Sequence, residues 1–471
     1  MKKEYRITFG TDGWRAVIAD DFTYDNLYIV AEAAARYFKR HKKVDKGVII
    51  GYDARFMSGD FAAYTAEVLG NRGIKVFLSD TIASTPMVSL AIAKRKAAGG
   101  IVITASHNPP RYNGFKLKEE YGGPAHPEMI ERLEKHVHKL LDQDKKKPKS
   151  VKPLEELKKQ GIVKNIDLTN LYIEDVRNKI DLDVIRNMDI KIAYDAMYGA
   201  GAGVIGHLVD SVEELRSAHN PSFGGINPEP LPQHMGPLFD AMKSGGYNIG
   251  FATDGDADRI GAVDEKGQFV DSHRIFALLI KYLYEQKGLR GTVVKSFSVT
   301  ELVDKMCERY TIPLHITPVG FKHICREMVE GDVLVGGEES GGIGVKNHIP
   351  ERDGILIGLL LCEMIAVREK KLSELVDELM EDYGYHFYNR IDMHVLKKEQ
   401  PRIIRTFKKG LDTIAGYPVR SRNDLDGFKF YFDHGWLLIR SSGTEPLIRY
   451  YAEANSPDKV EKILRFATSV R

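Results

Sequence analysis

Three stretches of this chain share one pattern, in which an apolar, strand-like run leads directly into a loop of small and charged residues. The first stretch is the most complete, with β-branched runs at 46–53, 74–80 and 99–106 separated by helical patterns at 60–72 and 86–95. Alternating strands and helices of this kind form βαβ units with parallel strands and right-handed crossovers. The pattern therefore predicts an α/β fold with mainly parallel inner strands.

The same order of segments recurs twice more. Strand-like runs at 190–201 and 248–259 begin and end a second unit, and runs at 291–300 and 332–342 do so for a third. Parallel α/β sheets bind ligands at the carboxyl ends of their strands. The loops that follow these ends read TASHNPP, TDGDADR and GGEESGG. We therefore expect three related α/β domains whose loops face one central cleft and form one composite site.

The remainder of the chain differs in character. Beyond about residue 380 the sequence becomes strand-rich, and a last helix is predicted over 457–470, with Ser456 as its N-cap and Pro457 at its first position. We interpret this part as a fourth, α+β domain, and the lysine-rich segment 142–160 as a surface linker. The predicted domain limits are 1–150, 165–260, 261–375 and 380–471.

Composition excludes several classes of protein. A formal net charge of +2 over 471 residues requires neither nucleic acid nor an anionic membrane as partner. No run approaches the roughly 18 apolar residues of a membrane span, and the start MKKEYRITFG lacks a signal-peptide core, so we expect a cytoplasmic protein. The three cysteines, without CxxC spacing, argue against a disulfide framework or a zinc site.

The loop TDGDADR carries a carboxylate at every second position. Asp254, Asp256 and Asp258 repel one another unless a cation lies among them, and their oxygen atoms suit Mg²⁺, Ca²⁺ or Mn²⁺ better than zinc. An EF-hand that began at Asp254 would need glycine where the chain has Arg259. Arg259 can instead pair with a phosphate. A solvated acidic turn is the alternative without a metal.

Ser106 directly follows the first apolar strand. Its hydroxyl is expected at the strand end, where His107 and Asn108 add hydrogen-bonding groups and two prolines stiffen the loop. If phosphorylated, Ser106 would present acceptor oxygens to the cation. A lone serine in a polar turn is usually an ordinary surface residue, so the hypothesis rests on the position at the strand end.

Three further motifs suit a phosphorylated sugar, although each also fits a polar turn. In GGEESGG, Glu338 and Ser340 can bond sugar hydroxyls, and the glycines let the backbone approach a ligand. The motif FGTDGWRA supplies Arg15. The segment IRSSGTEPLIRYY gathers hydroxyl, guanidinium and glycine donors suited to phosphate, namely Arg440, Ser441, Ser442, Gly443, Thr444 and Arg449.

Taken in this order, the five motifs resemble those of the α-D-phosphohexomutase family (phosphoglucomutase/phosphomannomutase), and the resemblance spans the whole chain. It implies four domains around a deep cleft, a catalytic phosphoserine at Ser106, and Mg²⁺ bound by the three aspartates and the Ser106 phosphate. Arg15 and Lys116 match residues of proton transfer, beside which we place His107 as a candidate. The implied substrate-binding residues are Arg259, Lys295, His323, Glu338, Ser340, Arg440, Ser442, Gly443, Thr444 and Arg449.

The resemblance also implies a reaction. A phosphoserine donates its phosphoryl group to a hexose monophosphate, and the resulting 1,6-bisphosphate, typically glucose 1,6-bisphosphate, returns its other phosphate to the serine. Family members with the doubled acid of GEES resemble enzymes that use glucose 1-phosphate, often together with mannose 1-phosphate. The TASHNPP form is unlike the SASHNP form that is usual in glucosamine mutases. We therefore expect glucose first, mannose second and glucosamine third.

Other activities are also compatible with the sequence. The main activity could be that of a phosphomannomutase or a phosphoglucosamine mutase, and the chain could be a non-catalytic relative that only binds sugar phosphates. A metal-dependent phosphatase or kinase is a third alternative. A P-loop kinase is disfavoured because GxxxxGK[ST] is absent from the sequence, and no early aspartate motif of the phosphatase type stands out. Either a monomer or a homodimer is compatible with the sequence.

Overall fold

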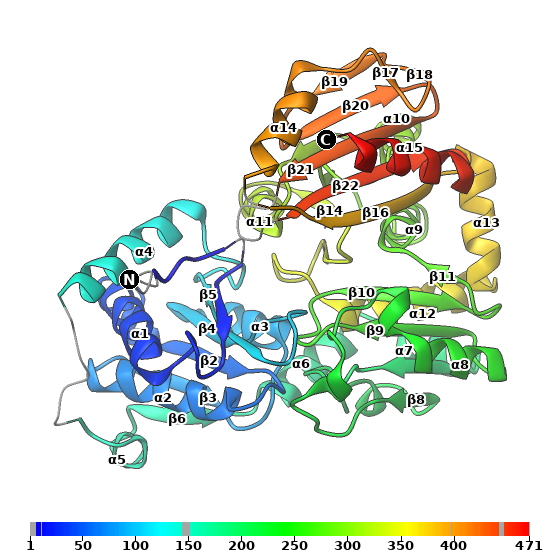
Figure 1. Ribbon diagram of the computed structural model, residues 1–471. Helices are drawn as coiled ribbons and strands as arrows, with labels where there is room; N and C mark the ends of the chain where they lie inside the picture. Colours follow the sequence, from blue (N-terminus) through cyan, green and yellow to red (C-terminus); the bar gives the residue numbers. More distant parts are fainter. Residues whose placement is uncertain (1–5, 11, 144–150, 397, 442–446, 471) are drawn as a thin grey trace.

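The chain forms four successive units, each built on its own β-sheet (Figure 1). The computed structural model describes residues 6–10, 12–143, 151–396, 398–441 and 447–470. Parallel pairs form the centre of the first three sheets, whereas the fourth sheet is antiparallel. The predicted fold class, three α/β domains followed by an α+β domain, is confirmed.

The first sheet has six strands in the order β1-β5-β4-β2-β3-β6. Side chains along its inner strands alternate between two apolar cores, as the two-residue period of a strand requires: Ile50 and Ile101 lie in one core, and Ile49 and Val102 in the other. The strands are β1 (Trp14–Val17), β2 (Val48–Tyr52), β3 (Val76–Ser79), β4 (Gly99–Ile103), β5 (Tyr112–Lys118) and β6 (Val163–Ile166), and the helices are α1 (Tyr24–Lys39), α2 (Ser58–Asn71), α3 (Thr85–Arg95), α4 (Pro127–Asp142) and α5 (Leu154–Lys159).

The second sheet has the order β11-β10-β9-β7-β8. Its strands β7 and β9 are parallel neighbours, as the second unit of the sequence predicted. The strands are β7 (Ile192–Asp195), β8 (Val212–Leu215), β9 (Ile249–Thr253), β10 (Ile260–Asp264) and β11 (Phe269–Val270), and the helices are α6 (Leu168–Arg177), α7 (Leu182–Asn187) and α8 (Gly236–Ser244). Helices α3 and α6 lie together between the first two domains (Figure 1).

The third sheet has the order β13-β12-β14-β15, with β12 parallel to both of its neighbours. Its elements are β12 (Thr292–Ser296), β13 (Leu314–Thr317), β14 (Val333–Gly337), β15 (Ile343–Val345), α9 (Ser272–Glu285), α10 (Leu302–Tyr310), α11 (Phe321–Glu330), α12 (Gly354–Arg368) and α13 (Leu372–Tyr383). Helix α12 is apolar on almost every side because it is buried between domains. Within the described residues, no helix is long and apolar enough to cross a membrane.

The fourth domain packs on the third. Trp436, Leu438 and Tyr451 form an apolar cluster with Phe297 of the third domain. Lys429 Nζ donates to the Phe297 carbonyl at 3.0 Å and lies 3.9 Å from the centroid of the Trp436 ring. The elements are β16 (Phe387–His394), β17 (Thr413–Ile414), β18 (Tyr417–Pro418), β19 (Ser421–Asn423), β20 (Phe428–Phe432), β21 (Gly435–Ser441), β22 (Leu447–Ala454), α14 (Gln400–Lys409) and α15 (Pro457–Ser469).

Each loop at the carboxyl end of a central strand is followed by an antiparallel return strand. β5 follows β4, β10 follows β9, and β15 follows β14, each as its antiparallel neighbour in the sheet. These return strands were not predicted from the sequence. They fix the far side of each loop, so that all three loops are held at both ends by hydrogen-bonded strands.

Side-chain caps explain where many helices begin. The predicted cap is confirmed, because Ser456 Oγ accepts a hydrogen bond from the backbone N–H of Lys459 at 3.4 Å and Pro457 is the first residue of α15. Other helices begin in the same way, with an oxygen of the residue before the first turn accepting from the backbone, at Thr23, Ser84, Asp167, Asp181, Asp271 and Asp353.

Strand pairing corrects two of the predicted domain limits and the predicted linker. β6 pairs with β3, so the first sheet continues beyond residue 150. The predicted limit between residues 260 and 261 falls inside β10, which pairs with β9 of the second sheet. The predicted linker 142–160 contains α5, whose Leu157 is fully buried in the core of the first domain. Two leucines among lysines and glutamates were too weak a signal to predict that helix.

Candidate active site

Ser106 lies where the loop after β4 meets the loop after β9. Its hydroxyl donates to Asp254 Oδ2 at 2.7 Å and lies 3.3 Å from His107 Nδ1. Its backbone N–H donates to Thr104 Oγ1 at 2.8 Å, and its φ of +52° is in the left-handed region that serine rarely adopts. The sequence-predicted serine and the first predicted aspartate are thus in direct contact across two domains.

The three aspartates form one buried cluster. Each has no exposed surface, and one carboxylate oxygen from each of the three lies within 4.8 Å of the other two. Asp254 Oδ1 accepts from the backbone N–H groups of Asp258 at 2.9 Å and Arg259 at 3.2 Å, which shapes the loop around the carboxylates. Among the described residues, the Oδ1 atoms of Asp256 and Asp258 are buried without a hydrogen-bond partner. Unpartnered carboxylate oxygens next to a serine hydroxyl fit a hard divalent cation such as Mg²⁺.

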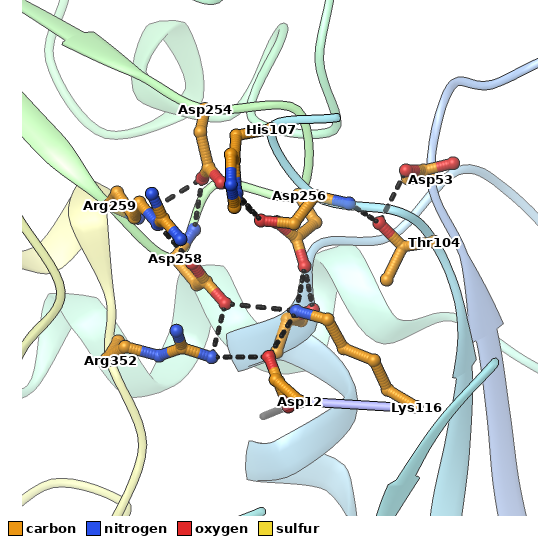
Figure 2. A network of polar contacts seen from close by, with 12 residues as sticks. Asp12, Asp53, Thr104, His107, Lys116, Asp254, Asp256, Asp258, Arg259 and Arg352 are labelled. Atoms are coloured by element: carbon orange, nitrogen blue, oxygen red, sulfur yellow. Dashed lines mark hydrogen bonds and ion pairs between the residues drawn. The ribbon is translucent and has the colours of Figure 1, made fainter. Parts of the chain in front are cut away.

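The other oxygens of Asp256 and Asp258 are held by protein cations (Figure 2). Lys116 Nζ, on β5, lies 2.7 Å from Asp256 Oδ2 and 3.2 Å from Asp258 Oδ2. Arg352 Nη2 lies 2.7 Å from Asp258 Oδ2 and 2.8 Å from Asp12 Oδ2, and Lys116 also pairs with Asp12 at 2.8 Å. One oxygen of each carboxylate is therefore fixed. The Oδ1 atoms accept no hydrogen bond among the described residues, and that of Asp258 has a long ion pair of 4.0 Å with Arg259 Nε.

The surroundings shift the protonation equilibria of the site in opposite directions. Burial, reinforced by repulsion from Asp256 and Asp258, raises the pKa of Asp254 well above its usual value. Burial alone would also raise the pKa of Asp256, but Lys116 lowers it below its usual value. For His107, burial and the nearby Arg259 lower the pKa well below its usual value, so its imidazole is neutral at pH 7. The charged form of Asp254 is therefore disfavoured by its neighbours, and a cation bound among the three carboxylates would offset their repulsion.

The third loop joins the same place from the third domain. Glu338 Oε1 accepts from the backbone N–H of Gly320 at 2.8 Å, and burial raises the pKa of Glu338. Ser340 is partly exposed. Gly341 has a φ of +89°, and its carbonyl oxygen accepts from the backbone N–H of Ile260 at 3.1 Å. The sugar loop predicted from GGEESGG thus packs directly on the strand that follows the aspartates.

The remaining predicted residues of the first three domains lie in different surroundings. Arg15 Nη1 donates to Asn108 Oδ1 at 2.6 Å, so it borders the serine loop, the segment 104–111 between β4 and β5. Arg259 Nη1 pairs with Glu229 at 3.0 Å. His323 is half-buried in the first turn of α11. Lys295 is buried, pairs with Asp304 and donates to the Thr300 carbonyl at 2.9 Å; within the described part of the chain its polar contacts do not include the aspartate cluster.

The predicted phosphate motif of the fourth domain is only partly described. Arg440 and Arg449 are directly opposite each other on β21 and β22, an arrangement that is unfavourable for two cations unless anions lie close by. Arg440 Nη2 lies 2.8 Å from Asp426 and Arg449 Nε lies 3.5 Å from Asp392. Ser442, Gly443 and Thr444, which the motif places between these strands, lie outside the described residues.

Several contacting residues were not predicted from the sequence. Asp12 and Arg352 bridge to the cluster as described above, and Thr85 Oγ1 donates to Asp256 Oδ2 at 2.5 Å. Arg55 binds the backbone of the serine loop. Asp12 stands in the same motif as Arg15, which was a usable signal. Nothing local marks Thr85 or Arg352, because their partners lie 171 and up to 340 residues away in the sequence.

Comparisons with known proteins agree with this four-part arrangement. Models of the phosphoglucomutase/phosphomannomutase family match four segments: alpha/beta/alpha domain I at residues 6–144, domain II at 170–267, domain III at 271–383, and the C-terminal domain at 397–468. These segments cover the loops that carry Ser106, Asp254 and Glu338, and the segment that carries Arg440.

Relatives that match along almost their whole length are named for different hexose phosphates. A phosphoglucomutase/phosphomannomutase of Thermococcus kodakarensis is 30% identical over 97% of this chain and 96% of its own length. A phosphoglucosamine mutase of Carboxydothermus hydrogenoformans is 31% identical over 97% of each chain. The crystal structure of a putative phosphomannomutase from Thermus thermophilus is 36% identical, covers 99% of both chains and superposes with a TM-score of 0.85. This chain belongs to the phosphoglucomutase/phosphomannomutase family, the α-D-phosphohexomutases.

Proposed function

We propose that this protein interconverts hexose 1-phosphates and hexose 6-phosphates through a phosphoserine at Ser106, with glucose phosphates as preferred substrates and mannose phosphates as further ones. In the first step the bond between Ser106 Oγ and phosphorus breaks, the free hydroxyl oxygen of the hexose monophosphate gains the phosphoryl group, and the proton of that hydroxyl ends on Ser106 Oγ. In the second step the 1,6-bisphosphate returns its other phosphoryl group to Ser106.

One observation carries this proposal. The hydroxyl of Ser106 lies 2.7 Å from Asp254, beside two buried carboxylate oxygens that have no hydrogen-bond partner among the described residues. A serine on a polar surface turn would not have this environment. A phosphoryl group on Ser106 would instead lie against cation ligands and against Lys116, where the charge of a transferring phosphoryl group is stabilised.

A magnesium ion, when bound, would neutralise negative charge on the phosphoryl group, and Asp254, Asp256, Asp258 and Ser106 are the residues that would hold it. The chain's own residues do the rest. Arg15 and Lys116, which border the serine loop and the aspartates, are assigned to the movement of the substrate proton, with His107 as a further candidate. Arg259 is assigned to the phosphate that is transferred.

The sugar and its second phosphate are assigned to the third and fourth domains. Glu338 and Ser340 would read the sugar hydroxyls, with His323 and Lys295 as further contacts. Arg440, Ser442, Gly443, Thr444 and Arg449 would hold the phosphate that is not transferred. Because the intermediate must present both of its ends to Ser106, the fourth domain is expected to move as a hinge between the two steps.

A different hexose is the main competing proposal. Relatives named for glucose and mannose and relatives named for glucosamine match this chain at similar identity, 30% and 31%. Glucose is preferred here because of the doubled acid of GEES and the TASHNPP form of the serine loop. The assignment is tested by kcat/KM on glucose, mannose and glucosamine 1-phosphates, and it fails if glucosamine 1-phosphate is the best of the three.

Turnover of the same sugar phosphates, followed in a coupled enzyme assay, tests the mutase reaction. Ser106→Ala is expected to abolish turnover, and EDTA is expected to remove it in the unchanged protein until Mg²⁺ is restored. Ser89→Ala is the matched control, because Ser89 is a buried serine of α3 whose hydroxyl has no hydrogen-bond partner among the described residues. Equal turnover by the two alanine variants would contradict the role of Ser106, and no turnover on any hexose phosphate would favour a non-catalytic sugar-phosphate-binding protein.

A further inference from the structure

Arg55, in the loop after β2, points away from solvent and into the backbone of the serine loop. Its side chain and that of Asp53 have no exposed surface. The Arg55 Nη2 atom donates to the carbonyl oxygens of Ser106 at 2.5 Å and Asn108 at 2.7 Å, and Nη1 donates to those of Pro109 at 2.9 Å and Tyr112 at 3.1 Å. One guanidinium thus binds three carbonyls of the serine loop and the carbonyl of the first residue of β5.

The fifth donor of Arg55 fixes the guanidinium itself. Nε pairs with Asp53 Oδ2 at 3.1 Å, so all five N–H groups of the side chain are used. The ring of Phe223, from the second domain, lies 5.0 Å from the guanidinium carbon. A buried guanidinium without a spare donor has nothing to offer a substrate phosphate, and this distinguishes Arg55 from Arg15 and Arg259.

Asp53 also reaches the serine loop by a second route. Asp53 Oδ2 accepts from Thr104 Oγ1 at 2.5 Å, and Thr104 Oγ1 accepts from the backbone N–H of Ser106 at 2.8 Å. Both polar backbone groups of Ser106 are therefore held, the N–H through Thr104 and the carbonyl by Arg55. This matters because Ser106 has a left-handed backbone, which is unfavourable for a non-glycine residue and persists only when the surroundings enforce it.

The Ser106 carbonyl that Arg55 binds faces the aspartate loop, the segment 254–259 between β9 and β10. A Cβ atom on Gly255 would lie 2.5 Å from the Ser106 carbonyl oxygen, so the two loops are in contact at this point. The carbonyl bound by Arg55 therefore sets how closely the Ser106 backbone approaches the aspartate loop, and hence where the Ser106 hydroxyl stands relative to Asp254.

We propose that Arg55, fixed by Asp53, is a positioning residue for phosphoryl transfer: its guanidinium locks the serine loop so that Ser106 Oγ is held against the aspartate cluster. This inference rests on the proposed role of Ser106 as phosphoryl carrier. Arg55 touches neither substrate nor the aspartates, so its loss should slow the transfer to and from Ser106 more than it weakens substrate binding.

The test compares Arg55→Lys, which keeps the charge but not the planar five-donor geometry, with Arg216→Lys. Arg216 is the matched control because its guanidinium is also largely buried, pairs with Asp195 and donates to the His234 carbonyl at 2.9 Å in the second domain. The measurements are the rate at which Ser106 gains a phosphoryl group from glucose 1,6-bisphosphate, followed by mass spectrometry of the intact protein, and kcat and KM on glucose 1-phosphate.

For Arg55→Lys, phosphoryl uptake and kcat should fall about 100-fold, the loss that a displacement of about 1 Å produces, with KM changed by less than about threefold. The rise in melting temperature on adding Mg²⁺ should persist, because the aspartates are untouched. Uptake and kcat equal to those of Arg216→Lys would overturn the inference and leave the proposed function intact. Absence of uptake by the unchanged protein would overturn both.

Thr104→Val keeps the inference testable if the Arg55 variants do not fold. This nearly isosteric change removes the hydroxyl that joins Asp53 to the Ser106 N–H, without touching the guanidinium. Uptake slowed relative to the unchanged protein supports the positioning role, whereas uptake at the unchanged rate contradicts it.

Discussion

At the scale of single residues, the site depends on a close approach that only glycine permits. Ser106 has a left-handed backbone, and its carbonyl oxygen would lie only 2.5 Å from a Cβ atom added to Gly255. The same Cβ would lie 3.1 Å from Pro228 Cγ, so it would be crowded by a second group as well. Gly255 therefore lets the serine loop and the aspartate loop touch.

We predict that Gly255→Ala separates these loops while the domains stay folded. The added methyl group should lower kcat on glucose 1-phosphate about 100-fold, by displacing Ser106 from Asp254, and lower the free energy of unfolding by about 1–3 kcal/mol through overpacking. Gly236→Ala is the control, since no heavy atom lies within 4 Å of the place its new methyl group would take and its φ is not positive. A kcat for Gly255→Ala equal to that of the control would show that the close approach is unimportant.

The residues that sequence reasoning identified share one property, which is that a local pattern marks them. Ser106 and Asp254 each follow an apolar strand, and the alternating carboxylates are conspicuous on their own. Arg55 and Arg352 have no such mark. Arg55 stands in an ordinary polar loop, and the carbonyl groups that it binds lie 51 to 57 residues further along the chain. Roles that arise only from long-range contact could not be predicted from one sequence.

At the scale of elements, the central parallel strands were predictable and the return strands were not. β2, β3 and β4 are continuous apolar runs, which is typical of strands buried on both faces. β5 reads YNGFKLK, and its lysines would ordinarily be placed on a solvent-facing side. Lys116 and Lys118 are instead buried, because Asp12, Asp256, Asp258 and Glu351 neutralise them from distant parts of the chain.

Helices of the third domain are joined by a carboxylate that should make their stability depend on pH. Glu378 of α13 accepts hydrogen bonds from Lys281 of α9 at 2.9 Å, from Arg368 of α12 at 3.1 Å and from Lys370 at 3.0 Å. Burial alone would raise the pKa of Glu378, but these bonds lower it to about 2 from an ordinary 4.5. The folded protein therefore keeps this carboxylate charged where the unfolded chain would be protonated.

We predict that Glu378→Gln lowers the free energy of unfolding by about 1–3 kcal/mol at pH 7, the usual worth of hydrogen bonds to a charged group. Because the folded pKa is depressed, the stabilisation is fully present above pH 4.5 and is lost as the pH falls toward 2. Urea unfolding at several pH values should show the difference between the two proteins shrinking below pH 4.5. A difference that stays constant down to pH 3, or one matched by Glu381→Gln on the exposed side of α13, would contradict this account.

At the scale of the whole molecule, the site exists only because three domains meet. Arg352 of the third domain bridges Asp12 of the first and Asp258 of the second. Next to it, Glu351 pairs with Lys118 on β5 of the first domain, and neither side chain is exposed. Buried charges of this kind cost free energy when one partner is removed, because the other is left without compensation.

We predict that Lys118→Met destabilises the protein by about 1–3 kcal/mol, since buried Glu351 loses the cation on its Oε2 atom and keeps Arg352, whose Nε lies 3.2 Å from Oε1. The double variant Lys118→Met, Glu351→Gln should recover much of that loss, because the carboxylate that lost its lysine is then neutral. Urea unfolding of both variants and the unchanged protein measures this coupling. Destabilisation that is merely additive in the double variant would mean that the pair does not couple the first domain to the third.

The central claim is that Ser106 carries the phosphoryl group, and the most direct measurement is its phosphorylation during a single turnover. Protein incubated with Mg²⁺ and glucose 1,6-bisphosphate is analysed by mass spectrometry and then mixed with glucose 1-phosphate. We predict that one phosphoryl group appears on the peptide containing Ser106 and passes to the sugar as fast as turnover requires, and that Ser106→Ala gains none while Ser89→Ala behaves as the unchanged protein. Turnover of glucose 1-phosphate by a protein whose Ser106 never gains a phosphoryl group would contradict the account.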